Sequence, residues 1–449
     1  MKKWLSAVVC FLLFAALLVG ATFLLQRKES YRKTHEFYTE KENIDVLFFG
    51  ASHGMNGIYP MQLFEDYGIV SYNLCGPAHP MPTNYWVMRN ALDYKKPQTV
   101  VIDCVFSSSS QLVPEKVSHM HRSFDTMPFS KTKVLALKDL IPDDAKKRSA
   151  FYWNFVMYHN RWEELGAQDF SFATSKEKGA ISLDDHVDLI DQAGSLREAE
   201  DGETVQGSDA GEESVGQQYL RRMIEECKAR NINVVLTYLP FDMYEPFFED
   251  EIKVMEDLAE EYDVRCINFM EIGVVDYRTD FSDFEHLNVQ GARKVTDYLG
   301  QYLMAHQLAT DQSQNGVYAA WKEDTIEYRR EMLAHASTTD GFAYLSQLYK
   351  GHVKTYLEIE NGCDNKLMKD ETFLALLTNL GVDSSKIGKG TQVLLLTDES
   401  VQYLDAAMYS SEAGIIIDGT CYECEKGEKG IRLVTLSDEL PDYVEKKAF

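Results

Sequence analysis

Four almost continuous apolar runs, separated by segments of helical period, constrain the fold of this chain most strongly. The runs lie at 44–49, 99–102, 232–239 and 264–269. A strand that is buried on both faces of a parallel sheet has such an unbroken apolar sequence. Segment 219–229, between two of them, carries Leu220, Met223, Ile224 and Cys227 at helical spacings of three and four residues. Alternating strands and helices predict an α/β domain with helices on both faces of a parallel sheet.

The N-terminal segment 1–26 is typical of a membrane anchor. No charged residue occurs from Trp4 to Leu25, and 22 helical residues span about 33 Å, enough to cross a bilayer core of about 30 Å. A cleaved signal peptide has an apolar core of only about 7–15 residues, so an uncleaved single-pass anchor is favoured over a signal peptide. Basic residues flank both ends of the run, and the positive-inside rule therefore leaves its orientation open.

Polar segments divide the rest of the chain. The acidic segment 197–216 lacks a buried-face period and is expected to be a mobile surface loop, while the polar DQSQNG stretch at 311–316 marks a domain boundary. The expected units are an anchor at 1–26, a stalk or short helix at 27–43, the α/β domain at 44–308, a helical linker at 309–350 and a small α/β accessory domain at 351–449. In the accessory domain, strands are predicted at 354–359, 392–396, 414–417 and 431–436, and a helix near 371–380.

The composition excludes some classes of partner. Asp and Glu outnumber Lys and Arg by 71 to 45, which gives a formal charge of −26. Nucleic-acid binding depends on basic side chains that displace counterions from phosphates, so we expect no DNA or RNA partner. Eight cysteines in 449 residues do not amount to a disulfide framework. Cys421 and Cys424 form a CxxC pair, but they lack the strand-to-helix setting of a redox site and a second pair for zinc.

A serine directly follows the first apolar run. In the turn Gly50-Ala51-Ser52-His53-Gly54, the serine lies at the carboxyl end of the first predicted strand, where sites form in doubly wound folds. A serine at the start of the next helix can expose its hydroxyl, with backbone N–H groups close by to stabilise an oxyanion. Taken alone, Ser52 is more readily explained as a helix N-cap.

An aspartate and a histidine lie three residues apart before the last helix of the α/β unit, predicted near 289–308. Asp283 and His286 can approach within one turn, so the carboxylate can hold the imidazole tautomer that accepts a proton from a serine. A serine needs such a base because its free hydroxyl is a poor nucleophile at neutral pH. Asp280 is the competing partner for the histidine. The serine and the DxxH pair together are far more specific than either one alone.

Three segments resemble the SGNH (GDSL-like) hydrolase superfamily, namely IDVLFFGASHGMNGIYP, YNLCGP and DFEHLNVQGARKVTDYL. They are most similar to its membrane-anchored Gram-positive members, such as the D-alanyl transfer protein of teichoic-acid modification and the polysaccharide O-acetylation proteins. The resemblance covers about residues 44–308 and implies a flavodoxin-like three-layer α/β sandwich. It also implies that Ser52 is the nucleophile, His286 the general base and Asp283 the orienting carboxylate.

The resemblance implies an oxyanion hole with one departure from the family pattern. The backbone N–H of Ser52 is expected to be one donor, and a glycine after the second strand aligns with either Gly76 or Ala78. The family has an asparagine after the third strand, which would fall near Ser107, where this chain has none. Loss of one donor can cost about 10²- to 10³-fold in rate, which argues against simple esterase activity. Some acyl-transfer relatives also lack this asparagine.

Other polar residues are weaker candidates. His53 and His79 flank the motifs expected at the site, and Arg122 and Arg161 lie in polar, aromatic segments, so all four are candidates for substrate binding. Local hydrogen bonds and salt bridges are the competing explanation for each of them. The His119-Met120-His121 segment has no further ligand cluster beside it, so no metal is predicted.

The sequence therefore predicts an enzyme that transfers an acyl group, in particular acetyl, to a cell-envelope polysaccharide through a Ser52 acyl-enzyme, with no cofactor. The alternatives are a glycan O-acetyl esterase and a catalytically silent glycan-binding or assembly factor. By the family resemblance, a membrane-bound O-acyltransferase is a further expected partner, and the chain is expected in the cell membrane with its catalytic domain outside the cytoplasm. The segment 351–449 also resembles interleukin-like (ILEI-type) domains, which implies a glycan- or partner-binding module.

Overall fold

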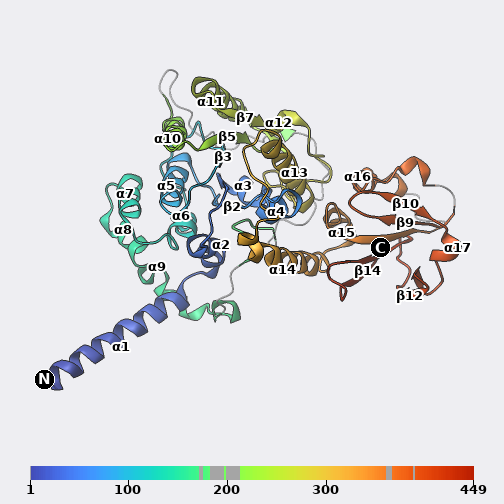
Figure 1. Ribbon diagram of the computed structural model, residues 1–449, viewed down its shortest axis with the longest axis horizontal. Helices are drawn as coiled ribbons and strands as arrows, with labels where there is room; N and C mark the ends of the chain where they lie inside the picture. Colours follow the sequence, from blue (N-terminus) through green and yellow to red (C-terminus); the bar gives the residue numbers. More distant parts are fainter. Residues whose placement is uncertain (1, 171–174, 183–196, 199–212, 361–366, 388–389) are drawn as a thin grey trace.

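The computed structural model describes residues 2–170, 175–182, 197–198, 213–360, 367–387 and 390–449. Figure 1 shows an α/β domain from which one long helix, α1, projects at the N-terminal end. A second domain, built around an antiparallel sheet, lies on the opposite side and contains the C-terminus. Helix α14 connects the two domains.

The first domain is built on a parallel sheet of five strands in the order β2-β1-β3-β5-β7. The strands are β1 (Val46–Phe49), β2 (Ser71–Asn73), β3 (Thr99–Asp103), β5 (Asn233–Tyr238) and β7 (Arg265–Asn268). This is the flavodoxin-like strand order, in which the chain reverses direction across the sheet between β1 and β3. The four strands predicted from apolar runs are confirmed as β1, β3, β5 and β7. Strand β2 is only three residues long and gave no such run.

Helices cover both faces of this sheet, which makes the predicted three-layer sandwich. One face carries α3 (Ser52–Gly57), α4 (Pro60–Tyr67) and α13 (Val289–Ala305), which pack against one another. The other face carries α5 (Met81–Ala91), α10 (Val215–Ala229) and α11 (Pro246–Tyr262). The predicted helices at 219–229 and 289–308 are confirmed as parts of α10 and α13. Most of the segment 197–216, expected as a mobile loop, lies outside the described residues.

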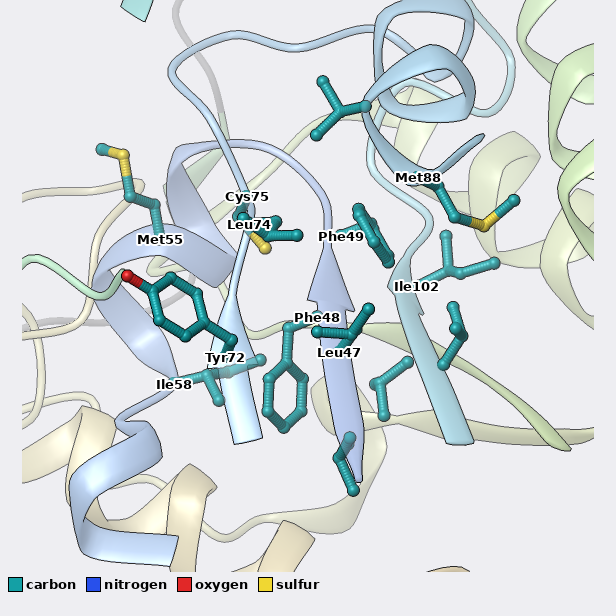
Figure 2. Close-up of a cluster of buried hydrophobic side chains, with 14 of the residues drawn as sticks. Leu47, Phe48, Phe49, Met55, Ile58, Tyr72, Leu74, Cys75, Met88 and Ile102 are labelled. Carbon is teal, nitrogen blue, oxygen red and sulfur yellow. The ribbon is translucent and has the colours of Figure 1, made fainter. Parts of the chain in front are cut away.

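The core of this domain explains the unbroken apolar sequence of its first strand. Leu47, Phe48 and Phe49 of β1 are all completely buried, because both faces of the strand are covered. Figure 2 shows these side chains between those of the neighbouring strands, including Tyr72 and Ile102. Fully burying one such side chain contributes about 1.5–3 kcal/mol, so the centre of the sheet fixes the position of the residues that follow β1.

Two helices precede the sheet. Helix α1 (Lys2–Leu25) is long and apolar enough to cross a membrane, and its side chains are almost all exposed to solvent. The Lys28 ammonium donates to the carbonyl of Phe23 at 2.5 Å and to that of Gln26 at 3.1 Å, which satisfies carbonyl groups at the C-terminal end of this helix. Helix α2 (Lys28–Thr39) occupies the segment predicted as a stalk or short helix. Its Phe37 is completely buried in the domain core, so α2 packs on the domain.

Short helices fill the long connection between β3 and α10. They are α6 (Val117–Phe124), α7 (Lys131–Leu140), α8 (Ala145–Tyr152), α9 (Phe155–Tyr158) and the 3-10 turns η1 (His159–Glu163) and η2 (Ala167–Phe170). Helix α9 and both 3-10 turns contact α1, and α2 contacts α6. A two-residue pairing, β4 (Arg197–Glu198) with β6 (Met243–Tyr244), and the short helix α12 (Phe269–Ile272) complete the domain.

The accessory domain contains an antiparallel sheet in the order β10-β9-β8-β13-β14. Its strands are β8 (Lys354–Ile359), β9 (Gln392–Leu396), β10 (Val401–Leu404), β13 (Ile431–Leu436) and β14 (Val444–Ala448). The hairpin β11 (Gly414–Ile417) and β12 (Thr420–Glu423) and the helices α15 (Gly341–Gln347), α16 (Glu371–Asn379) and α17 (Ala406–Tyr409) complete it. All four predicted strands and the predicted helix are present. The likeness to interleukin-like domains stays a prediction.

The cysteines of the described residues are free thiols. They are Cys10, Cys75, Cys104, Cys227, Cys266, Cys421 and Cys424, while Cys363 lies outside the described residues. In the CxxC pair, Cys421 is exposed within β12 and Cys424 is buried just after it.

Helix α14 (Ala319–Ala336) belongs to both cores. Trp321 and Tyr328 are buried in the core of the first domain, and Leu333 and Ala336 are buried in that of the second. The ammonium of Lys178, which is also buried, lies 4.5 Å from the Trp321 ring centre and donates to Asp324 at 2.7 Å. The segment 309–350, predicted as a linker, therefore contributes packing to the first domain.

We expect a chain that ends at Thr310 to be much less stable than one that ends at Asp340, although both contain the whole predicted α/β domain. The shorter chain loses Trp321, and removing a buried Trp costs about 3–5 kcal/mol. Thermal unfolding of both truncations, followed by circular dichroism in detergent, measures the difference. Replacing Trp321 by Ala in the full chain should destabilise the first domain, and Ile326→Ala, on the exposed side of the same helix, should not. Equal melting temperatures for the two truncations would show that α14 is dispensable.

Candidate active site

The candidate serine lies at the carboxyl edge of the parallel sheet. Strand β1 ends at Phe49, Gly50 and Ala51 form the turn, and Ser52 begins α3. Gly50 permits a close approach to β3, since a Cβ atom on it would lie 2.6 Å from the Cβ of Asp103. The turn lies beside the β1/β3 switch point, where ligands bind in folds of this type.

Ser52, His286 and Asp283 form a continuous hydrogen-bonded line. The Ser52 Oγ lies 2.9 Å from His286 Nε2, and the His286 Nδ1 lies 2.9 Å from Asp283 Oδ2 and 3.0 Å from its Oδ1. The carboxylate also accepts hydrogen bonds from the backbone N–H groups of Glu285 at 2.8 Å and His286 at 2.7 Å. A carboxylate on Nδ1 keeps the proton there, which leaves Nε2 free to accept the serine proton.

The environment keeps Asp283 ionised. Burial alone would raise its pKa, but the hydrogen bond and charge of His286 outweigh that effect and lower the pKa to about 2. Because the folded-state pKa is lower than the unfolded one, ionisation of Asp283 stabilises the fold above about pH 4, and this contribution is lost as the pH falls towards 2. The carboxylate is therefore charged at every pH at which the protein would be assayed.

Asp280, the competing partner for His286, has other contacts. It is completely buried and accepts hydrogen bonds from the Lys294 ammonium at 2.7 Å, the Gln290 amide at 2.7 Å and the Asp276 backbone N–H at 2.6 Å. These contacts hold the loop that carries Asp283 and His286 against α13. In the accessory domain, Asn379 at the end of α16 contacts the same network, donating to Thr279 Oγ1 at 2.9 Å and accepting from Lys294 at 3.1 Å.

The structure distinguishes the two candidates for the second oxyanion donor, the backbone N–H groups of Gly76 and Ala78. The Gly76 N–H donates to the Gly50 carbonyl at 3.0 Å, so it is already in use. A Cβ on Gly76 would collide with the ring of His79, which explains why this position is glycine. Ala78 has a φ of 50°, in the left-handed region that costs a non-glycine residue about 1 kcal/mol or more. Among the described residues, no acceptor lies in hydrogen-bonding position for its N–H, so Ala78 is the better candidate.

The segment after β3 gives no donor in place of the missing asparagine. Ser107 is buried, and its hydroxyl donates to the Glu251 carbonyl at 3.2 Å in α11. Its backbone N–H donates to the Cys104 carbonyl at 3.0 Å. The Ser107 side chain is therefore not available as the third oxyanion donor that the family resemblance implies.

Of the two histidines proposed for substrate binding, His53 lies beside the triad and His79 does not. The His53 ring is stacked 5.4 Å from that of His286 and contacts Phe241 at 4.2 Å. Burial lowers the pKa of His53 to about 3, so it is neutral, and neither ring nitrogen hydrogen-bonds to a described residue. His79 is completely buried and lies 3.3 Å from the Ser123 hydroxyl. It supports the turn that carries Ala78.

Arg122 and Arg161 line a cavity of about 390 Å³ together with Arg27. The lining of this cavity includes no residue of the triad. The structure therefore does not support the predicted role of Arg122 and Arg161 in binding an acceptor at Ser52.

One group of three possible metal ligands occurs among the described residues. His53, Glu285 and His286 place their ligand atoms within 4.8 Å of one another. The pair named in the sequence, His119 and His121, is not part of it. His121 is buried, bonds Asp125 at 2.7 Å and stacks on Phe151 at 3.8 Å between ring centres. Asp283 already holds the His286 Nδ1, so a cation bound to the first group would take the other ring nitrogen, which faces Ser52. Binding of a cation there would therefore compete with the triad.

A buried acid pair behind the nucleophile turn has no counterpart in the sequence-based prediction. Burial raises the pKa of Asp103 to about 7 and that of Glu251 to about 8. Glu251 accepts from the Tyr238 hydroxyl at 2.8 Å and from the Phe106 N–H at 2.8 Å, whereas the Asp103 oxygens have no well-aligned donor among the described residues. The available signal was the position of Asp103, a charged residue at the carboxyl end of a predicted strand.

Replacing Asp103 by Asn should stabilise the protein progressively as the pH rises. A carboxyl whose folded-state pKa is raised binds its proton more tightly in the folded state, so it destabilises the fold above its unfolded pKa of about 4, up to the folded value of about 7. Between pH 5 and 8, we expect the unfolding free energy of Asp103→Asn to gain about 2 kcal/mol relative to the unmodified protein. Urea unfolding at both pH values measures this. Asp257→Asn, at an exposed site, is the control, and a pH-independent difference for Asp103→Asn would contradict the prediction.

Comparison with protein-family models and with curated proteins finds no match for this chain. Among solved structures, it is similar to a GDSL-like lipase from Bacteroides thetaiotaomicron, with 11% identity and a TM-score of 0.32, over 62% of this chain and 98% of that one. It is similar to the same degree to a proposed acylhydrolase from Bacteroides fragilis, with 11% identity and a TM-score of 0.32, over 63% of this chain and 99% of that one. These scores are too low for either similarity to decide the fold or the activity, which rest on the geometry of this chain.

Proposed function

We propose that this chain is a serine-dependent acyl-ester enzyme. The observation that carries the proposal is the line of hydrogen bonds from Ser52 through His286 to Asp283, with separations of 2.9 Å at each step. This spacing is within the 2.6–3.2 Å that proton transfer between a nucleophile and its base requires. A helix-capping serine and a surface histidine would have no reason to meet in this way across more than two hundred residues of sequence.

The chemistry follows from the three roles. The Ser52 oxygen attacks the ester carbonyl carbon while its proton passes to His286 Nε2, and the tetrahedral oxyanion is stabilised by the backbone N–H groups of Ser52 and Ala78. As the intermediate collapses, the bond to the alcohol breaks and the alcohol takes the proton from His286. The acyl group stays on Ser52. A second hydroxyl or a water molecule then gives its proton to His286 and attacks the acyl carbon. As this second intermediate collapses, the bond to the Ser52 oxygen breaks and that oxygen takes the proton back from His286, which regenerates the enzyme.

The proposed reaction is transfer of acetyl or a similar acyl group to a cell-envelope polysaccharide. The apolar helix α1 supports anchoring in the cell membrane next to such acceptors and next to a membrane-bound O-acyltransferase that would supply the acyl group. By the family resemblance, some acyl-transfer members also lack the third oxyanion donor, so its absence is compatible with transfer. A glycan O-acetyl esterase would use the same triad.

Mass spectrometry of the acceptor distinguishes transfer from hydrolysis. The full chain in detergent is given an activated acetyl ester with and without envelope oligosaccharides. We expect slow ester consumption alone, faster consumption with an acceptor, and an acetylated sugar that Ser52→Ala does not produce. Rapid hydrolysis with no acetylated product from any oligosaccharide would favour the esterase. No turnover and no reaction with a fluorophosphonate would favour a silent glycan-binding or assembly factor.

Metal removal tests the competing use of the His53, Glu285 and His286 group. The proposed mechanism requires no cation, so dialysis against EDTA should leave ester turnover unchanged. Added zinc should inhibit, because it would take the His286 nitrogen that accepts the serine proton. The same titration with Glu285→Gln should show weaker inhibition by zinc. Loss of turnover on EDTA treatment, restored by zinc, would instead identify a metal-dependent hydrolase.

A further inference from the structure

A cavity lined by three arginines lies where helix α1 joins the rest of the protein. Its volume is about 390 Å³, and its polar lining comes from three separate parts of the chain. It is lined by Arg27, Ser118, His119, Arg122, Met157, Tyr158, Asn160, Arg161 and Glu164. The proposed acyl chemistry uses none of these residues.

The position of the cavity relative to α1 sets its height in a membrane. Arg27 comes two residues after the last residue of α1, and Arg161 donates to the Leu25 carbonyl at 2.6 Å. Figure 1 shows α9 beside this end of α1, and both 3-10 turns also contact the helix. The 23-residue span Lys3–Leu25 is about 35 Å long, compared with a bilayer core of about 30 Å. If α1 spans the bilayer, as proposed above, the cavity lies at the level of the lipid headgroups.

Large exposed aromatic side chains near α1 are also typical of the headgroup level of a membrane. Trp162 in η1 is 65% exposed and Phe170 in η2 is 61% exposed, and both turns contact α1. Trp153, just before α9, is 44% exposed. Tryptophan is enriched at the membrane–water interface because its ring is amphipathic. In water these exposed side chains would be unfavourable, and the headgroup region of a bilayer would cover them.

The charges in the cavity favour an anion. Three arginines line the cavity, and Glu164 is the one carboxylate in the part of its lining that the structure describes; it lies 4.0 Å from Arg27 and 3.6 Å from Arg161. A second carboxylate, that of Asp169, holds Arg161 in place at 3.0 Å. Burial and the neighbouring Arg122 charge lower the pKa of His119, which favours its neutral form. Guanidinium groups match the geometry of phosphate oxygens, and Ser118 and Asn160 add neutral donors.

We propose that this cavity binds the phosphate headgroup of an anionic phospholipid and so fixes the domain against the membrane surface. The proposal rests on the membrane span of α1 but not on the acyl chemistry. The lipid phosphodiester lies between Arg27 and Arg122, with Arg161 as a fixed third positive group. The exposed aromatic residues enter the interface around it. Headgroup binding then gives the domain a defined tilt, which a single helix followed by a free stalk would not give.

Native mass spectrometry of the full chain in neutral detergent tests the site. We expect phosphatidylglycerol to bind at least about tenfold more tightly than phosphatidylcholine with the same acyl chains. Both lipids carry a phosphodiester, but the positive choline group of phosphatidylcholine would lie beside three arginines and offset their attraction to the phosphate. The double variant Arg27→Gln/Arg122→Gln should lose this preference. The control Arg221→Gln/Arg330→Gln removes the same charge from α10 and α14 and should keep it.

Three outcomes would overturn the proposal. These are equal binding of the two lipids, an unchanged preference in Arg27→Gln/Arg122→Gln, and displacement of the lipid by free glycerol phosphate at equal concentration, which would identify a soluble phosphate ligand. Alkaline extraction of membranes that contain the full chain tests the span separately. A chain that stays in the membrane but shows no lipid preference refutes the headgroup site alone, whereas a chain that is released refutes the anchor.

Discussion

Ser52→Ala and His286→Ala should each reduce turnover of an activated acetyl ester by about 10⁴- to 10⁶-fold, and the double variant should be no worse than either single variant. The two side chains meet at 2.9 Å and act as one unit, because the serine is a nucleophile only while the histidine accepts its proton. Steady-state kinetics with the full chain in detergent measures the loss. The residual rate reflects binding and the oxyanion donors alone.

Matched controls separate this effect from damage to the fold. Ser110→Ala and His306→Ala remove the same groups from exposed positions and should keep full turnover. All four single variants should melt within about 2–4 °C of the unmodified protein, because none removes a large buried side chain. Turnover by Ser52→Ala at the unmodified rate would show that the reaction, if any, takes place elsewhere.

Asp283→Asn should mainly reduce turnover, whereas Asp280→Asn should mainly reduce the free energy of unfolding. Asp283→Asn keeps the shape of the side chain but loses the charge that holds the His286 tautomer, so turnover should fall by about 10⁴-fold, with a smaller loss of stability than in Asp280→Asn. Asp280→Asn leaves the buried ammonium of Lys294 without its charged partner, and breaking a buried ion pair from one side costs about 3–5 kcal/mol. Its effect should appear mainly in the unfolding free energy.

Turnover and thermal unfolding must both be measured to distinguish the two carboxylates. Replacing Asp280 and Lys294 together, by Asn and Met, should recover part of the stability lost in Asp280→Asn, since the charge left unpaired is then also removed. A large kinetic loss in a fully stable Asp280→Asn variant, with normal turnover in Asp283→Asn, would reassign the orienting carboxylate.

The sheet could be predicted from the sequence because complete burial leaves a simple pattern. Strands β1, β3 and β5 are covered on both faces and therefore have short, almost continuous apolar runs. Strand β2 has three residues, Ser71, Tyr72 and Asn73, two of them polar, and it lies at the sheet edge. The resemblance placed a strand there, but the apolar pattern did not.

Helices α2 and α14 make buried contacts that their sequences did not predict. The segment 27–43 is charged and predicts a stalk or short helix, yet Thr34 and Phe37 of α2 are buried against the domain. In α14 the apolar residues are spread around the helix because its two halves pack against different cores. One amphipathic stripe cannot describe such a helix.

The sequence predicted the side chains of the candidate site, but it could not predict which backbone N–H groups are available at that site. The residue types of Ser52, Asp283 and His286 already indicate their chemical roles, and the structure places the three side chains in hydrogen-bonding contact. The choice between Gly76 and Ala78 depends on which N–H group is already bonded, and backbone hydrogen bonds leave no trace in residue identity. The arginines at 122 and 161 are chemically suited to an acceptor, but the fold places them near α1.

The most direct test is to find which atom a fluorophosphonate modifies. The full chain is treated with the probe in detergent, digested and sequenced by mass spectrometry. We expect one adduct, on the Ser52 hydroxyl, with none in His286→Ala and an unchanged adduct in Asp280→Asn that is still folded. An adduct on another serine, or unmodified Ser52 in a protein that turns over esters, would contradict the triad.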